Sequence, residues 1–276
     1  MNGIGGYVFV RDIGRGVHGR VFLAAPPPRL DVTAGEIAVK VFSADAAEEG
    51  FDAMAERLHA FADLASPRLV HLHEAGLEGR NAFCSMRFEP SGSLASPTRE
   101  VGRPERLQAV GRAARAVHEL HEAGIVHRGV RPANILLAPG AALLAEPAVA
   151  QLLSRGEHLT GLGTRGDARD LEFVDPALMR GGVPGRPSDI WALGVTLHIA
   201  MTGFGLYPAL TSADPMVAAR MFLRSRPEPD AELSPRERAV VSRAIHPDPS
   251  ERYPTAAALA DDIDGVARVR TGASGA

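Results

Sequence analysis

Residues 13–22 read IGRGVHGRVF, in which Gly14, Gly16 and Gly19 form the pattern G-x-G-x-x-G and Val21 follows two residues later. Glycines at this spacing permit a tight turn and let backbone N–H groups approach a phosphate closely. The pattern alone is weak in a chain with 29 glycines, so its flanks decide the interpretation. A dinucleotide-binding loop leads from a strand into a helix, whereas YVFVRDI and RVFLAA on the two sides both read as strands. The stretch therefore predicts a β-hairpin with a glycine-rich tip.

A second strand carries a charge on an apolar face. The segment EIAVKVF, residues 36–42, alternates between two faces, one with Ile37, Val39 and Val41 and the other with Ala38, Lys40 and Phe42. A lysine is costly to bury there without an anionic partner. An edge strand with its lysine facing water would avoid the cost, but the nearby glycine-rich stretch favours a phosphate partner for Lys40.

The periodicity of apolar residues changes near residue 90, from mainly strand-like to helical. Before it, a helix is expected over 45–64 and two further strands over 69–79 and 82–88. After it, helical spacing recurs, and helices are predicted over 104–123, 188–202, 213–223, 234–245 and 254–268. We expect one α+β domain over 1–270. Its small β-rich lobe covers about 1–87, a hinge about 87–90 and a larger, mainly helical lobe about 91–268, before a flexible tail over 269–276.

Composition excludes several classes of protein. The chain has 276 residues, is 45% hydrophobic and has a net charge of −3, without a basic tract that would indicate nucleic-acid binding. Its longest apolar run, IWALGVTLHIAM at 190–201, is too short for a bilayer, which needs roughly 20 residues. The N-terminus does not resemble a signal peptide, and the single cysteine, Cys84, is expected to be buried. We expect a cytoplasmic protein, or the cytosolic part of a larger one.

Six ordered segments resemble a Hanks-type protein kinase of the bacterial Ser/Thr branch, from about Tyr7 to Val266. They are GRGVHGRV, IAVK, SMRFEPSGSL, HRGVRPAN, SDIWALGV and HPDPSERYPTA. The resemblance implies a bilobal kinase-like fold that binds ATP and Mg²⁺. It assigns Gly14, Gly16, Gly19 and Lys40 to the phosphates, Val21, Ala38 and Leu136 to the adenine, Met86 to the gatekeeper position and Phe88 to the hinge. It also assigns Asn134 to a metal ion, and Asp189 to a buried anchor beneath the catalytic loop.

The same alignment exposes departures at the catalytic positions. Gly129 stands where the family has the aspartate that accepts the substrate proton, and Arg131 replaces a lysine. Glu146-Pro147-Ala148 replaces the metal-binding Asp-Phe-Gly motif, so Glu146 is at best a weakened Mg²⁺ ligand. No intact catalytic set is therefore expected.

Further departures concern the acids around this site. The activation segment ends in Asp175-Pro176-Ala177, and Glu172 or Asp175 is expected to replace the missing glutamate partner of Arg252. Strict spacing puts Arg57 where the family has the glutamate that pairs with Lys40, with Glu56 one residue away. Asp170 replaces a threonine; it is a conceivable substitute base, but such an acid is more often solvated.

These observations favour a pseudokinase that retains ATP binding and regulates an unknown protein partner, with a homodimer possible. The alternative is a low-activity or unconventional Ser/Thr kinase with Glu146 on the metal and another group taking the proton. A different transfer reaction on the same fold has no specific support. Ser154, Thr160 and Thr164 are expected to be ordinary loop residues rather than phosphate acceptors.

Overall fold

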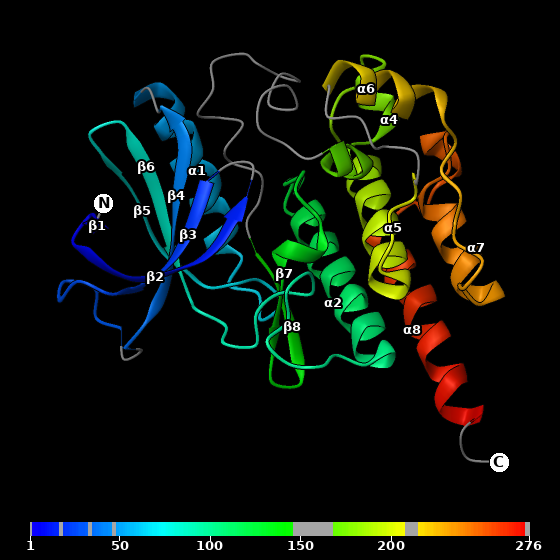
Figure 1. Ribbon diagram of the computed structural model, residues 1–276, viewed down its shortest axis with the longest axis horizontal. Coiled ribbons are helices and arrows are strands. Elements are labelled where there is room, and N and C mark those ends of the chain that lie inside the picture. The colour runs from blue at the N-terminus through cyan, green and yellow to red at the C-terminus, as the bar shows by residue number, and fades with distance from the viewer. Residues whose placement is uncertain are drawn as a thin grey trace. The chain divides into compact units, whose positions relative to one another are not determined.

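The computed structural model describes residues 2–16, 19–32, 35–45, 48–145, 168–207 and 215–273. The described chain divides into two compact units. The first contains residues 2–65 and 70–89, and the second contains 66–69, 90–145 and 168–273. Figure 1 shows that the strands β1 to β6 belong to the first unit and that most helices belong to the second.

The first unit is built on a six-stranded sheet with the order β1-β2-β3-β4-β6-β5, in which each neighbouring pair is antiparallel. The strands are β1 (Gly3–Ile4), β2 (Tyr7–Gly16), β3 (Gly19–Ala25), β4 (Ile37–Asp45), β5 (Leu72–Glu78) and β6 (Asn81–Met86). The helix α1 spans Glu48–Asp63. The hairpin, the helix and the later strands were predicted; the two-residue strand β1 was not, because it is too short to show alternation.

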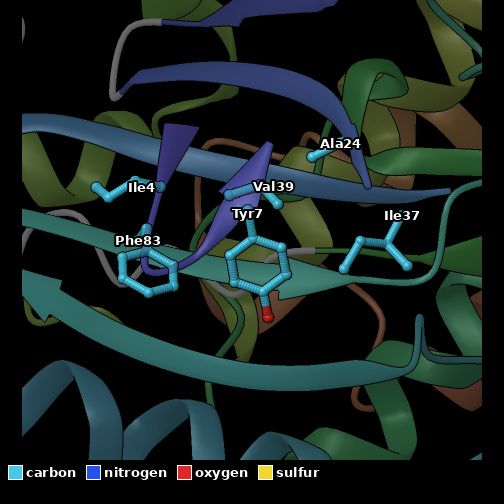
Figure 2. Close-up of a cluster of buried hydrophobic side chains, with 6 residues drawn as sticks. All are labelled: Ile4, Tyr7, Ala24, Ile37, Val39 and Phe83. Atoms are coloured by element: carbon cyan, nitrogen blue, oxygen red, sulfur yellow. The ribbon is translucent and has the colours of Figure 1, made fainter. Parts of the chain in front are cut away.

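A buried cluster holds this sheet together (Figure 2), consisting of Ile4, Tyr7, Ala24, Ile37, Val39 and Phe83. Ile37 and Val39 come from the predicted apolar face of β4. The Tyr7 hydroxyl donates to Glu74 Oε1 at 2.5 Å and lies 2.9 Å from Ser85 Oγ. Burial, followed by this bond to Glu74, raises the pKa of Tyr7 to about 12. Tyr7 thus keeps its hydroxyl hydrogen-bonded while its ring fills the core.

The second unit is mainly helical. Its helices are α2 (Arg103–Glu122), α4 (Pro176–Met179), α5 (Arg186–Thr202), α6 (Pro215–Arg224), α7 (Pro235–Ala244) and α8 (Ala256–Ala273). Short 3₁₀ helices are η1 (Pro132–Asn134), η3 (Ala168–Phe173) and η4 (Pro249–Glu251), and β7 (Ile135–Ala138) pairs with β8 (Ala141–Leu144). The helix α8 continues to Ala273, beyond its predicted end at 268, and so includes part of the stretch expected to be a flexible tail.

The helix α5 lies at the centre of this unit. Nearly every residue from Ser188 to Met201 is buried, since the sequence is apolar around the whole helix. The helix α2 packs against both α5 and α8 (Figure 1). Across the part of the chain that the structure describes, no helix is both long and apolar enough to cross a bilayer. The buried surroundings of α5 give Asp189, near its first turn, a fixed position.

Candidate functional site

The glycine-rich stretch forms the predicted hairpin between β2 and β3. Gly14 faces Val21 and Gly16 faces Gly19 in the ladder, while residues 17 and 18 lie outside the described residues. Asp12 accepts the N–H of Gly14 at 3.0 Å and pairs with the Arg20 guanidinium on the opposite strand. Arg20 also holds the pKa of Asp12 below its usual range. This cross-strand bridge stabilises the hairpin and was not anticipated from the sequence.

Two glycines of the motif have different surroundings. A Cβ on Gly19 would lie 2.2 Å from the backbone oxygen of Val41, and its φ is +151°. The close approach of β4 therefore requires glycine at position 19. A Cβ on Gly14 would meet no atom within 4 Å, so packing does not require glycine there. The space beside Gly14 leaves room for a ligand.

Lys40 is buried in the middle of the sheet, with only 5% of its surface exposed. Its strand β4 has a neighbour on each side, pairing Lys40 with Val21 of β3 and Cys84 of β6. The alternative of an edge-strand lysine that faces water is therefore wrong. The Nζ atom lies 5.2 Å from the centre of the Phe42 ring, on the predicted shared face.

Ala38, assigned to the adenine, and Met86, assigned to the gatekeeper position, are neighbours in this sheet. Ala38 faces Met86 across β4 and β6, and both are buried. Val21 and Phe88 are half-buried. On α1, Arg57 is half-buried and Glu56 is exposed.

In the second unit, Asp189 holds the loop that precedes η1. Its carboxylate accepts the backbone N–H of His127 at 2.7 Å and that of Arg128 at 2.8 Å, and it lies 2.8 Å from His121 Nε2. Arg128 has a φ of +62°, an unusual conformation for a residue other than glycine. The hydrogen bond to Asp189 holds this conformation, so Asp189 is the buried anchor that the sequence predicts.

Gly129 and Asn134 lie together in this loop. The Asn134 Nδ2 atom donates to the Gly129 oxygen at 2.7 Å, and the Gly129 N–H donates to His127 Nδ1 at 3.1 Å. With Nδ2 so used, the Asn134 Oδ1 atom is the one left to act as a hard oxygen ligand, which suits Mg²⁺. Leu136, at the start of β7, is half-buried. The loop thus keeps its backbone geometry without a side chain at position 129.

Arg131 forms an ion pair with Asp170 of η3. Arg131 Nη2 lies 2.7 Å from Asp170 Oδ1, and each side chain is 24% exposed. The guanidinium also lies over the Phe173 ring, 4.9 Å from its centre. The expectation that Asp170 is simply solvated is therefore wrong. The two residues are 39 positions apart, and no local sequence pattern signals their pairing.

The sequence predicted that either Glu172 or Asp175 would be the partner of Arg252. Asp175 contacts Arg252 Nη1 at 2.5 Å and Nη2 at 2.9 Å, and both side chains are buried. Asp175 also caps α4 by accepting the N–H of Ala177. Glu172 instead accepts the N–H of Leu206 at 2.7 Å. The prediction that a nearby acid replaces the missing glutamate is confirmed, with Asp175 in that position.

Some predicted residues lie outside the described ranges: Glu146, Pro147, Ala148, Ser154, Thr160 and Thr164. Glu146 as a metal ligand therefore stays a prediction. Within the ranges that are described, no cluster of three or more His, Cys, Asp or Glu side chains could hold a metal ion.

Comparison with known proteins places these features in context. Residues 7–262 match the family described as protein kinase domain. Serine/threonine-protein kinase PknK of Mycobacterium tuberculosis is 31% identical over 278 residues, covering 98% of this chain and 24% of its own. PknJ of Mycobacterium bovis is 30% identical over 270 residues, covering 92% and 44%. This chain thus spans between about a quarter and somewhat under half of the length of these relatives.

A solved structure gives the same fold. The crystal structure of a cysteine-to-alanine mutant of the Mycobacterium tuberculosis PknI kinase domain matches with a TM-score of 0.68 and 21% identity. The match covers 96% of this chain and 98% of the PknI chain. The α+β architecture predicted from the sequence is therefore confirmed.

Proposed function

The chain belongs to the protein kinase domain family, and from this membership we propose that it binds ATP with Mg²⁺ but transfers the γ-phosphoryl group slowly or not at all. Its main role is then that of a pseudokinase, a regulatory or scaffolding module for a protein partner. Gly129 is the observation that carries this proposal. Asp189 anchors the loop around Gly129 through two backbone N–H groups. Position 129 itself has no carboxylate that could receive a proton.

The nucleotide assignment rests on the first unit. Lys40 brings a cation to the same strand face as Ala38, and the space beside Gly14 leaves room for a phosphate. The full set assigned to ATP is Gly14, Gly16, Gly19, Val21, Ala38, Lys40, Met86, Phe88 and Leu136.

Asn134 and Glu146 are assigned to Mg²⁺. The oxygen donor of Asn134 fits a hard cation. When bound, the metal neutralises charge on the phosphates. Asn134 holds its own side chain in place by donating to Gly129, so its amide oxygen can be presented to a cation without reorganisation.

The magnitude of the catalytic loss favours a regulatory role. Loss of a general base lowers a rate by about 10²–10⁴-fold. Kinases turn over at roughly 1–100 per second, so a rate of roughly 10⁻⁴ to 1 per second remains. A low-activity Ser/Thr kinase is the second candidate, and the Arg131–Asp170 pair is the observation that favours it.

Two assays on the purified chain separate the candidates. ATP at about 100 times its Kd should stabilise the native state by about 2.7 kcal/mol, measured as a thermal shift with and without Mg²⁺. Incorporation of labelled γ-phosphate into the chain or a generic protein measures transfer. Lys40→Met, which keeps the buried aliphatic stem, is the control for both.

A shift without transfer supports the pseudokinase. Lys40-dependent transfer supports the second candidate, and transfer at an ordinary kinase rate refutes the first. If ATP causes no shift, with or without Mg²⁺, the nucleotide assignment is wrong.

A further inference from the structure

Asp170 is a carboxylate held against the loop that lacks one. Its Oδ1 atom is fixed by Arg131 at 2.7 Å, and Arg131 belongs to the same loop as Gly129. Stacking of Arg131 on Phe173 limits the movement of the guanidinium. The position of Asp170 is therefore defined by the loop itself.

The segment that carries Asp170 is anchored on its other side as well. Leu171 and Glu172, the next two residues, are both buried. The Trp191 indole N–H donates to the Glu172 backbone oxygen at 2.8 Å, and the Glu172 carboxylate accepts the N–H of Leu206. Asp170 is thus part of an ordered turn joined to α5, unlike a solvated acid of a surface loop.

The second carboxylate oxygen of Asp170 is open to a ligand. Among the described residues, Oδ2 has no hydrogen-bond partner, and the side chain is 24% exposed. One oxygen is fixed and the other can accept a hydrogen bond from outside the chain. A positioned general base needs this arrangement, because it must reach the proton it removes within hydrogen-bond distance.

We infer that Asp170 is the proton acceptor for the residual phosphoryl transfer, acting on the hydroxyl group of a serine- or threonine-containing protein. This inference rests on the proposed binding of ATP. The hydroxyl proton passes to Asp170 Oδ2 as the hydroxyl oxygen forms a bond to the γ-phosphorus. The bond from that phosphorus to the β–γ bridging oxygen breaks, and ADP leaves with the electron pair. Arg131 is the positioning residue that orients the carboxylate.

The decisive variant is Asp170→Asn, which keeps the shape and an acceptor oxygen for Arg131 but cannot take up the proton. Transfer of labelled γ-phosphate should fall by about 10²-fold or more, while the ATP-induced thermal shift stays unchanged. Glu232→Gln, the same loss of charge at an exposed residue of the same unit, should transfer at the wild-type rate.

A rescue experiment separates a proton acceptor from a merely structural acid. Gly129 does not have a positive φ, so an aspartate there brings no left-handed backbone strain. With Gly129→Asp already in place, the further change Asp170→Asn should no longer lower transfer, since the carboxylate at position 129 takes the proton instead. A structural role for Asp170 would cost the same factor in both backgrounds.

The outcomes are distinct. Loss of transfer in Asp170→Asn that disappears when position 129 is aspartate establishes the assignment. An unchanged rate in Asp170→Asn overturns it, as does a wild-type chain that binds ATP but transfers nothing; the second result leaves the pseudokinase proposal intact. A chain that does not bind ATP overturns both.

Discussion

Replacing Asp175 by asparagine should strongly destabilise the second unit, because its carboxylate is paired with Arg252 in the interior. The Arg252 side chain is 0% exposed and that of Asp175 is 3% exposed, so solvent cannot replace the lost carboxylate. Asparagine retains one acceptor oxygen, and with it the cap of α4 at Ala177. Its amide NH2 then replaces the oxygen that accepts from Arg252 Nη1, so the change removes the charge and one hydrogen bond of the pair.

Removing one partner of a buried ion pair costs about 3–5 kcal/mol. Arg252 keeps its hydrogen bonds to the backbone oxygens of His246 and Pro187, at 2.8 and 2.9 Å, which places the expected loss at the lower end. Taking about 3 kcal/mol, and about 2–4 °C per kcal/mol for chains of 150–250 residues, the midpoint should fall by about 6–12 °C.

Urea denaturation followed by tryptophan fluorescence measures the loss in the free energy of unfolding directly. Trp191 is the only tryptophan, it is buried, and its ring lies 5.2 Å from the Arg252 guanidinium carbon. Asp261→Asn is the matched control: Asp261 pairs with Arg115 but is 69% exposed, so its loss should cost less than about 1 kcal/mol. Equal losses in the two variants would refute the argument that burial gives the Asp175 pair its importance.

Two further outcomes are expected. Gly19→Ala should lower the thermal midpoint, because its Cβ would meet the Val41 oxygen at 2.2 Å, whereas Gly14→Ala should leave the midpoint unchanged while weakening the ATP-induced shift; equal midpoints for the two variants would contradict this. Burial lowers the pKa of His198, whose Nε2 accepts the N–H of Asp230 at 3.0 Å, so the unfolded chain takes up its proton first as pH falls. The stability contributed by His198 is complete above about pH 6.5 and is lost progressively below it. Urea midpoints at pH 7.5 and 5.5 should therefore differ less in His198→Gln than in the wild type. An equal pH dependence in the two proteins would contradict this role of His198.

Local patterns predicted much of this molecule. The hairpin around Gly14 and the buried face of β4 follow from alternation and glycine spacing, which depend on neighbours in the sequence. Lys40 could be assigned to a buried strand for the same reason. The anchor Asp189 came from family resemblance, since nothing in a helical pattern identifies which polar residue will accept distant backbone N–H groups.

Long-range choices between chemically similar residues were harder to predict. Glu172 and Asp175 were equally plausible partners of Arg252, and only the tertiary fold, which engages Glu172 with Leu206, separates them. Asp170 was expected in solvent, because the guanidinium that holds it is 39 residues away. The Tyr7–Glu74 bond, 67 residues apart, likewise has no local signature.

The hydrogen bonds from the backbone of residues 127 and 128 to Asp189 make this loop a suitable place for a spectroscopic label. Asp189 holds the loop through the N–H groups of residues 127 and 128, so a substitution at position 129 removes neither of these hydrogen bonds. The natural thiol, Cys84, is the only one in the chain and is buried. A Gly129→Cys variant would add a second thiol at a half-buried position of this loop, where a fluorophore or spin label would report events at the segment that Asp189 anchors.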